Sequence, residues 1–316
     1  MANGLPHESS RIYFTDGGME TTFIFLDGIE LPEFAAFPLL DSDTGRQRLR
    51  DYYRADLRIA EEHGAGFVLE TPTWRAHADV GARLGYDATG LDRVNQQAVG
   101  FLRALADDAA ADVIISGTLG PRGDGSVVGE PKTAEAAYAY HYPQVRSRAM
   151  AGADTVTALT LTYAEEAIGI ARAAAHFGVP AVISFTVETD GVLPSGESLG
   201  SAIERVDAAA PGAVAYYMLN CAHPTHFEDA LETDAPWLQR LRGLRANASA
   251  RSHVELDAAT ELDRVDPEDL AVRYAGILAQ VPEMSVLGGC CGTDHEHVAA
   301  IAEAISSTTD TAELAA

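Results

Sequence analysis

Short runs of apolar and β-branched residues alternate along the chain with longer amphipathic stretches rich in Ala, Leu and Arg. Each apolar run ends in glycine or polar residues, as expected of a buried strand that enters a loop. This repeated alternation predicts parallel strands joined by helical crossovers. We expect strands at residues 11–15, 67–70, 113–116, 155–160, 181–185, 214–219, 244–247 and 284–287.

The amphipathic stretches carry recognisable helix-start signals. Asp266 can cap a helix whose first residue is Pro267, and Thr293 with Glu296 has the spacing of a capping box. Eight strand and helix units are the number that a closed (β/α)8 TIM barrel requires, and we predict that fold. An open, doubly wound sheet would fit the same alternation, but no Gly-x-Gly-x-x-Gly turn follows the first strand, which weakens that alternative. Helices are expected at residues 45–63, 92–110, 133–151, 164–177, 198–209, 225–242, 267–280 and 294–305.

The chain length fits one barrel with short additions, because such barrels use about 250 residues and this chain has 316. No segment has the composition of a linker between two domains. We therefore predict a single barrel domain at residues 11–305, with an N-terminal extension at 1–10 and a frayed tail at 306–316. The long connections at 26–42 and 120–132 are expected to lie over the strand ends.

The charge of the chain narrows the range of partners. It has 47 acidic against 22 basic residues, a formal net charge of −25, and Lys132 is its one lysine. Such a surface repels phosphate backbones and anionic lipid, so we expect neither nucleic-acid nor membrane partners. Residues 1–10 lack the apolar core of a secretory signal, which predicts a cytoplasmic protein. Because Lys132 falls in a probable loop, a Schiff-base aldolase is disfavoured.

The three cysteines all fall at predicted strand ends. Cys221 follows the sixth strand, and Cys290 and Cys291 follow the eighth within the run GGCCGT at residues 288–293. In a barrel these ends share the face on which active sites lie. Three thiolates suit Zn²⁺ and leave its fourth tetrahedral position open. Alternatively the cysteines are inert core residues, or the adjacent pair forms a vicinal disulfide, but the grouping of all three at strand ends favours the metal.

Five motifs occur in an order that resembles the homocysteine S-methyltransferase family. They are DGGMET at residues 16–21, SGTLGP at 116–121, NC at 220–221, Asn247 and GGCCGT at 288–293. The resemblance covers residues 11–305. It implies that Cys221, Cys290 and Cys291 bind Zn²⁺ in a (β/α)8 barrel and that a thiol acceptor completes the tetrahedron. The bound thiol would attack the methyl group of a sulfonium, quaternary ammonium or folate donor.

The resemblance also implies roles for polar residues near the metal. Asp16 would contact the amino-acid part of the acceptor, and the amides of Gly17 and Gly18 would lie near its carboxylate. Asn220 and Asn247 would orient the loops of the site through hydrogen bonds. Each has a structural alternative: Asp16 can cap its own turn, and either asparagine can make a purely structural bond.

One position departs from the family pattern. The family carries a glutamate at the end of the fourth strand, where it holds the acceptor's ammonium group, but Leu159 stands there in this chain. Glu20 and Glu70 are carboxylates that the pattern does not contain, and a buried carboxylate needs a cation or hydrogen bonds. We hypothesise that Glu70, together with Glu20, binds a cationic group of the acceptor or donor. The alternative is that Glu70 pairs with Arg75 or Arg122.

Other candidates carry less weight. His223 and His226 could bind a metal, but three thiolates already supply the protein ligands, and surface histidines are common. We expect His295 and His297 to face solvent. Trp74 and Tyr163 follow the second and fourth strands, where each could attract a methylated cation or simply pack.

These observations favour a zinc-dependent S-methyltransferase whose partners are a small-molecule thiol, homocysteine or a related compound, and a methyl donor. Two alternatives stay open. One is a zinc hydrolase in which a carboxylate such as Glu70 acts as general base, and the other is a non-catalytic protein that binds zinc or thiols. A homodimer is an open option, since no segment of the sequence declares an interface.

Overall fold

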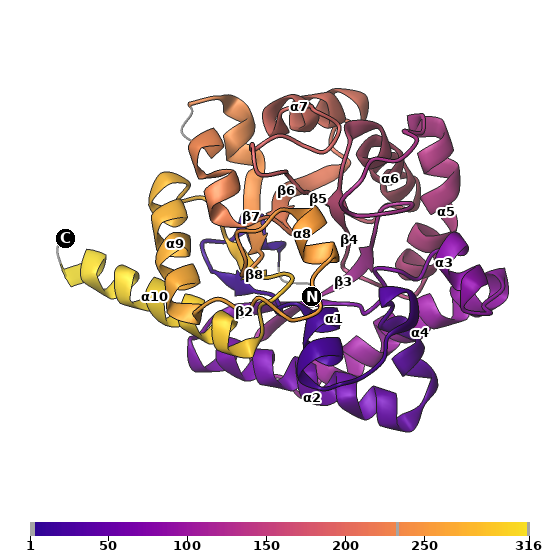
Figure 1. Cartoon of the computed structure of the whole chain (residues 1–316), viewed down its shortest axis with the longest axis horizontal. Helices are drawn as coiled ribbons and strands as arrows, with labels where there is room; N and C mark the ends of the chain where they lie inside the picture. The colour runs from indigo at the N-terminus through magenta and orange to yellow at the C-terminus, as the bar shows by residue number, and fades with distance from the viewer. Residues whose placement is uncertain (1–3, 232–233, 315–316) are drawn as a thin grey trace.

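The computed structural model describes residues 4–231 and 234–314. Its eight strands are parallel, each pairs with the next, and β8 pairs with β1, so the sheet is a closed barrel with helices around it (Figure 1). The predicted (β/α)8 TIM barrel is confirmed. The strands are β1 Tyr13–Phe14, β2 Gly66–Glu70, β3 Asp112–Leu119, β4 Thr155–Leu161, β5 Ala181–Phe185, β6 Val214–Asn220, β7 Leu241–Ala246 and β8 Val286–Gly289.

The helices begin at the polar caps that the sequence offers. The side chains of Ser42, Asp87, Thr133 and Ser198 each accept a hydrogen bond from a backbone amide of the first helical turn, which satisfies an otherwise orphan donor. The helices are α1 Met19–Thr21, α2 Asp43–Glu62, α3 Ala78–Arg83, α4 Ala88–Ala106, α5 Ala134–Met150, α6 Ala164–Phe177, α7 Leu199–Ala209, α8 His253–Asp257, α9 Pro267–Gln280 and α10 His295–Leu314.

The helix predicted at residues 225–242 is wrong. That stretch holds three short 3-10 turns, Pro224–His226, Glu228–Leu231 and Pro236–Arg240, and β7 already begins at Leu241. Proline explains the difference, because Pro236 lacks the amide hydrogen that a continuous helix needs and disfavours helical geometry in the residue before it. At the other end of the chain, α10 continues as a helix beyond residue 305 to Leu314, where a frayed tail was expected.

The apolar core forms two layers. The larger one lies between the strands and the surrounding helices. The smaller one plugs the barrel interior, where inward side chains alternate along each strand with outward ones. Glu70 stands two residues after the inward-pointing Val68, and Asn220 stands two residues after the inward-pointing Met218, so both polar side chains share the inward direction. The same strands that fill the interior therefore deliver polar groups to the carboxyl end of the barrel. The interior plug consists of Tyr13, Val68, Ile114, Val182, Tyr216, Met218 and Val286.

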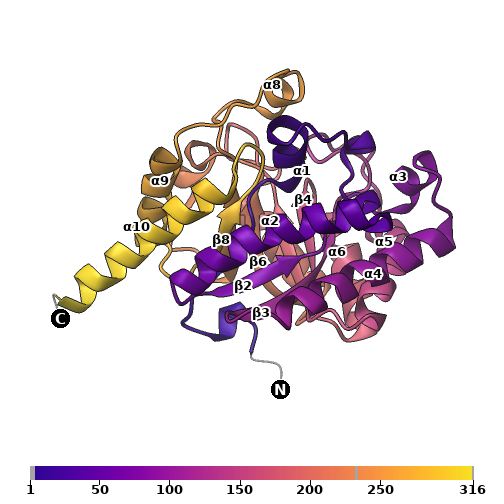
Figure 2. The ribbon, with the colours of Figure 1, turned by 90° about the horizontal axis from the view of Figure 1, so that it is seen from below.

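Loops and short helices gather at that carboxyl end. Figure 2 shows α1, which follows β1, and α8, which follows β7, at the same end of the barrel. The connection between α1 and α2 also lies there, since Phe34 lines a cavity together with strand-end residues. None of the helices in the described part of the chain combines the length and apolar character needed to cross a lipid bilayer.

Candidate active site

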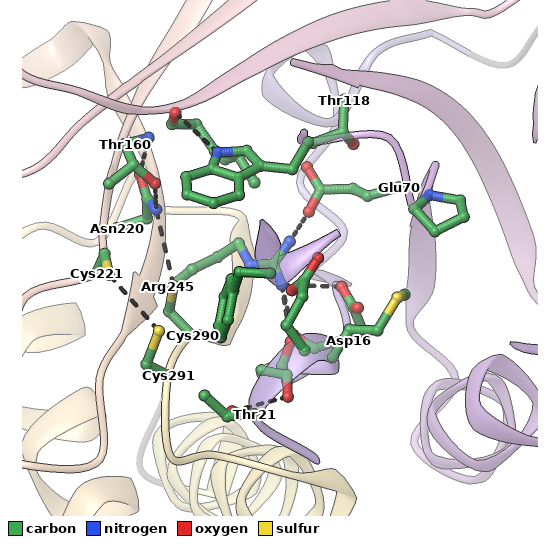
Figure 3. A pocket seen from close by; sticks show the side chains of 18 of the residues that line it. Asp16, Thr21, Glu70, Thr118, Thr160, Asn220, Cys221, Arg245, Cys290 and Cys291 are labelled. Carbon is green, nitrogen blue, oxygen red and sulfur yellow. Dashed lines mark hydrogen bonds and ion pairs between the residues drawn. The ribbon is translucent and has the colours of Figure 1, made fainter. Parts of the chain in front are cut away.

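The three cysteines meet at the carboxyl end of the barrel. Cys221 directly follows β6, and Cys290 and Cys291 directly follow β8, as predicted from the sequence. Their sulfur atoms all lie within 4.8 Å of one another, and the sulfurs of Cys221 and Cys291 are 3.8 Å apart (Figure 3). All three are free thiols, so the adjacent pair does not form the vicinal disulfide considered above.

These sulfurs fit the geometry of a zinc site. With a Zn–S bond of about 2.3 Å, the edge of a regular tetrahedron is about 3.8 Å. The separation of 3.8 Å between the sulfurs of Cys221 and Cys291 matches that edge. Three thiolate ligands with room beside them are the donor set of a catalytic rather than a structural zinc site.

The backbone of Cys221 is held in an unusual conformation. Its φ of 59° lies in the left-handed region, which a residue with a side chain adopts only at a cost. The Cys221 carbonyl oxygen accepts a hydrogen bond from Nδ2 of Asn247 at 3.0 Å and lies 2.6 Å from the ring Nε2 of His253. These two contacts, from Asn247 and His253, hold the strained residue.

Asn220 ties the sulfur cluster to β4 and β5. Its Oδ1 accepts from the backbone amide of Thr160 at 2.8 Å and from the hydroxyl of Ser184 at 2.7 Å. Its Nδ2 donates to the Thr160 hydroxyl at 2.8 Å and lies 3.8 Å from the sulfur of Cys290. Asn220 is only 1% exposed, and its amide is therefore fixed by partners on two other strands.

Gly17 and Gly18 let the loop after β1 approach the loop that carries Cys290. A Cβ on Gly18 would overlap the carbonyl oxygen of Cys290, and a Cβ on Gly17 would lie 3.0 Å from Cα of Asp294. The amide of Gly18 donates to the carbonyl of Thr293 at 3.0 Å, so it is already engaged within the protein. The two glycines are needed for this close backbone contact, whatever further part they play in binding.

Arg245 is the functional candidate that the sequence did not reveal. It extends from β7 and is 5% exposed. It forms ion pairs with Glu70 and, at 2.9 Å, with Oδ1 of Asp16, and it donates to the carbonyls of Gly17 at 3.0 Å and Gly289 at 2.9 Å. One guanidinium thus joins the ends of β1, β2 and β8 to β7 (Figure 3).

The expectation that Glu70 pairs with Arg75 or Arg122 is therefore wrong. Arg75 lies over the ring of Trp74 at 4.3 Å, and Arg122 pairs with Asp79 at 3.1 Å. The position of Arg245 on its strand agrees with its pairing to Glu70. Arg245 stands two residues after Gly243, so its side chain points toward the barrel interior, as a side chain at Gly243 would. Gly243 packs on the interior residue Met218, which identifies that direction as the barrel interior.

Glu20 differs from Asp16 and Glu70 in having no such cation. Burial raises its pKa from 4.5 to about 7, helped by the nearby charges of Asp16 and Cys290. Burial also raises the pKa of Asp16, although Arg245 and a hydrogen bond from the Tyr52 hydroxyl at 3.1 Å oppose the shift. Within residues 4–231 and 234–314, no ion pair is found for the Glu20 carboxylate, which accepts a hydrogen bond from its own backbone amide.

A cavity with an empty volume of about 620 Å³ opens beside the sulfurs. Carboxylates and cysteines line it together with apolar side chains that include Leu159 and Trp74. Such a mixed lining suits a small molecule with charged and apolar parts. The polar residues in its wall include Asp16, Glu20, Glu70, Asn220, Arg245 and the three cysteines, and the other residues include Gly17, Gly18, Met19, Phe34, Pro72, Trp74 and Leu159.

In the described residues, His223, His226, His295 and His297 lie outside the cysteine cluster. His223 is 5% exposed, bonds through Nδ1 to the Thr225 hydroxyl at 2.8 Å, and lies outside the cysteine cluster, as does His226. His295 is exposed as expected, but the expectation for His297 is wrong. His297 is fully buried, because its two ring nitrogens contact Asp294 at 2.9 Å and the carbonyl of Val265 at 3.1 Å.

Comparison with known proteins decides the family. The sequence profile described as homocysteine S-methyltransferase matches residues 13–305. The chain belongs to the homocysteine S-methyltransferase family. Family membership confirms the resemblance that the cysteine motifs suggested.

Among curated relatives, two methionine synthases match this chain over part of their own length. The one from Mycobacterium tuberculosis is 26% identical over 318 residues, which are 95% of this chain and 25% of the relative. The one from Mycobacterium leprae is 29% identical over 172 residues, which are 50% of this chain and 13% of the relative. The chain thus spans a quarter or less of the length of these curated relatives.

Among solved structures, the chain is similar to the homocysteine methyltransferase MmuM from Escherichia coli. The oxidised form has a TM-score of 0.76 and 21% identity, and the match covers 94% of this chain and 99% of MmuM. The metallated form has a TM-score of 0.73 and 22% identity, with coverage of 94% and 97%. At 21–22% identity this similarity supports a fold shared with MmuM, but it does not support a shared reaction.

Proposed function

We propose that the protein is a zinc-dependent S-methyltransferase that moves a methyl group from an activated donor to homocysteine or a related small thiol. The observation that carries this proposal is the cluster of Cys221, Cys290 and Cys291, whose sulfurs lie within 4.8 Å of one another beside a cavity. Bound there, Zn²⁺ would supply the lowered thiol pKa that makes a thiolate nucleophile available near neutral pH.

The protein's own groups would position the two substrates. In the transfer, an acceptor sulfur lone pair forms the new S–C bond while the bond from the methyl carbon to the donor breaks, and the donor keeps that electron pair. The acceptor sulfur, the methyl carbon and the leaving atom of the donor must lie in line, so holding the acceptor sulfur in place provides a large part of the rate enhancement. Asn220 and Asn247 hold the cysteine loops for this purpose, through the contacts with Thr160, Ser184 and the Cys221 carbonyl.

Glu20 would hold the ammonium group of an amino-acid acceptor. Leu159 lines the cavity where the family has a glutamate, and Glu70 is already neutralised by Arg245. Glu20 lines the same cavity and is the carboxylate without a protein cation in the described residues. We therefore assign the role hypothesised for Glu70 to Glu20, with Asp16 held beside it by Arg245 and Tyr52.

We expect the variant Glu20→Gln to bind amino-acid ligands about tenfold more weakly, because it lacks the charge that attracts their ammonium group. L-Methionine, the thioether product, is a suitable probe, since it has no thiol proton. Glu20 with a pKa of about 7 is ionised more fully as the pH rises, so methionine affinity should increase from pH 6 to pH 8 in the unmodified protein and stay level in the variant. Calorimetric titration measures both.

Glu30→Gln is the matched control, because Glu30 is a carboxylate of the nearby connection that lies outside the cavity wall. It should keep both the affinity and its pH dependence. Equal methionine affinity in Glu20→Gln and the unmodified protein at pH 8 would remove the assigned role from Glu20.

Methyl transfer itself is tested by incubating the zinc-loaded protein with homocysteine and each donor type, and detecting methionine by mass spectrometry. We expect methionine with at least one donor and at least a hundredfold less after treatment with a chelator. A zinc-loaded protein that binds homocysteine but gives no methionine with any sulfonium, betaine or folate donor would favour the non-catalytic alternative.

The hydrolase alternative loses its general base in this geometry. Glu70 would have to accept a proton near the metal, but its carboxylate is already engaged in an ion pair with the buried Arg245. We further propose that the catalytic unit spans residues 11–305 and that the free thiols keep their function in a reducing compartment such as the cytoplasm.

A further inference from the structure

A cavity on the outer side of the barrel lies apart from the cysteine cluster. It opens between α3, α4 and α5, which lie together at the right of Figure 1, and it has an empty volume of about 1300 Å³. No described residue lines both this cavity and the one beside the sulfurs. We call it the helix cavity, and its wall holds buried polar atoms that the fold does not use.

Gln144 of α5 lies in this wall with both ends of its side-chain amide unpaired. The side chain is 5% exposed and lines the helix cavity. Within the described part of the chain, neither its Oε1 nor its Nε2 has a hydrogen-bond partner. A buried amide left unpaired costs free energy, and a ligand that supplies both a donor and an acceptor recovers this cost. Gln144 therefore suits a molecule that has these two groups side by side.

Asn95 of α4 adds a second unpaired acceptor, and its orientation is fixed. The side chain lines the helix cavity and is 1% exposed. Its Nδ2 donates to the carbonyl of Ala76 at 3.1 Å, which determines the orientation of the amide. The Oδ1 of Asn95 has no partner among the residues that the structure describes. An oxygen held in this way accepts an N–H or O–H group and repels a carbonyl oxygen.

These unpaired atoms indicate the polar edge that a ligand needs. An amino group on an aromatic ring, next to a ring nitrogen, has two N–H donors and one acceptor on the same edge, as in adenine or cytosine. The amide of a glutamine pairs with such an edge through two hydrogen bonds. Gln144 would bind one amino hydrogen and the ring nitrogen, which leaves the second amino hydrogen for Oδ1 of Asn95. A ring carbonyl in place of the amino group would instead face that oxygen.

Aromatic side chains in the same wall suit a flat ring. Tyr86, Tyr140 and Tyr142 line the helix cavity. Their hydroxyl groups bond to residues outside its wall, namely Asp41, His77 and His176. The rings are therefore the part of these side chains that remains for a ligand, and nucleobases of every kind stack on aromatic rings.

The charges of the wall favour an uncharged ligand. Arg146 is the one base among the described residues that line the helix cavity, and it forms an ion pair with Asp92 at 3.6 Å. Asp87 adds a further carboxylate at the start of α4. A phosphate group would meet no unpaired cation in this wall, and the net charge of −25 also opposes an anion. The cavity therefore suits a base or a nucleoside better than a nucleotide.

We propose that the helix cavity binds an uncharged heterocycle that carries an amino group beside a ring nitrogen, such as the base of adenosine or cytidine. Gln144 and Asn95 recognise the polar edge of this ring, and the three tyrosines contact its faces. The site does not depend on the proposed methyl transfer, because it has no lining residue in common with the cavity beside the cysteines.

Calorimetric titration of the full-length protein with four nucleosides tests the recognition of the polar edge. Adenosine and cytidine carry the amino group, whereas inosine and uridine carry a carbonyl at the corresponding position. We expect saturable binding of adenosine or cytidine with a dissociation constant below about 1 mM, and at least about tenfold weaker binding of the matching carbonyl nucleoside. Adenosine monophosphate should bind no more tightly than adenosine.

Three variants test whether the nucleoside binds in the helix cavity. Gln144→Met keeps the length of the side chain and removes both polar ends, so it should weaken nucleoside binding at least about tenfold. Because the amide of Gln144 has no partner in the described residues, this variant should resist urea at least as well as the unmodified protein. Ala82→Trp narrows the cavity from an exposed position and should also weaken binding. Gln97→Met is the matched control, since Gln97 is an exposed glutamine of α4 outside the cavity wall, and it should leave the affinity unchanged.

Loss of selectivity for the amino group overturns the inference, as does the absence of saturable binding of both amino nucleosides. Equal affinity in Gln144→Met and Gln97→Met also contradicts it, because the nucleoside then binds elsewhere. A Gln144→Met protein that unfolds at clearly lower urea concentration would show that this amide stabilises the fold and is not reserved for a ligand. None of these measurements requires methyl transfer, so they decide the inference whether or not the proposed reaction occurs.

Discussion

Replacing Cys291 by serine should abolish stoichiometric zinc binding and lower methyl transfer at least about a thousandfold. The serine oxygen is a poor substitute for a thiolate, and only two of the three sulfurs that lie within 4.8 Å of one another would remain. Zinc content is measured by elemental analysis of the purified, reduced protein, and transfer is measured as methionine formed from homocysteine.

The control is Met150→Ser, which removes a sulfur from a side chain that is 68% exposed and far from the cluster in the fold. It should retain one zinc ion per chain and full activity. If Cys291→Ser also retains one tightly bound zinc ion, the metal is held elsewhere and the assigned site is wrong.

The variant Arg245→Met should be destabilised by about 3–5 kcal/mol, because it leaves Asp16 and Glu70 buried without their shared cation. Unpaired and buried, both carboxylates would have a raised pKa in the folded state. Ionising them then opposes folding, so the loss of stability should be larger at pH 8 than at pH 5. Urea unfolding at the two pH values measures the effect.

Two further variants make this prediction specific. Arg242→Met removes an arginine of the same strand that pairs with Glu283, whose side chain is 62% exposed, and should cost less than about 1 kcal/mol. Combining Arg245→Met with Glu70→Gln should recover part of the loss, because a neutral amide costs less to bury than a carboxylate. A loss in Arg245→Met no greater than in Arg242→Met contradicts the structural role of Arg245.

The barrel and the cysteine cluster could be predicted because both depend on regular spacing. Apolar runs and polar caps define strands and helices locally, and the bounds of α6 and α9 agree with the predicted ranges. Once the strands are parallel and closed, their carboxyl ends share one face, so Cys221 and Cys290 must come close although 69 residues separate them. The topology brings the cysteine loops to one end of the barrel, and the contacts of Asn220, Asn247 and Gly18 hold them there.

The charge pairing could not be predicted in the same way. From the sequence, Arg75 and Arg122 are the alternatives to a cationic ligand as partners of Glu70, but the pairing depends on how the strands are ordered and which way each side chain points. The structure selects Arg245, which lies 175 positions away. Because Arg245 occupies Glu70, the proposed binding of the acceptor's ammonium group passes to Glu20.

Local sequence was also insufficient where tertiary contacts override it. His297 stands on a helix start that resembles a solvated turn, but its bonds to Asp294 and Val265 place it in the interior. The contact of His297 with the Val265 carbonyl lies outside the local window of that helix start. The stretch at residues 225–242 is a different case, because Pro236 lies within it and is a local signal against a continuous helix.

The contacts that hold the cysteine loops have a consequence for how the proposed metal site would form. The Cys221 carbonyl is held by Asn247 and His253, and the Cys290 carbonyl lies against Gly18, so protein groups support both loops. We therefore expect the barrel to fold before it binds zinc, unlike zinc fingers, whose chain folds only around the ion. Such a preformed site would take up and exchange the ion without unfolding of the barrel.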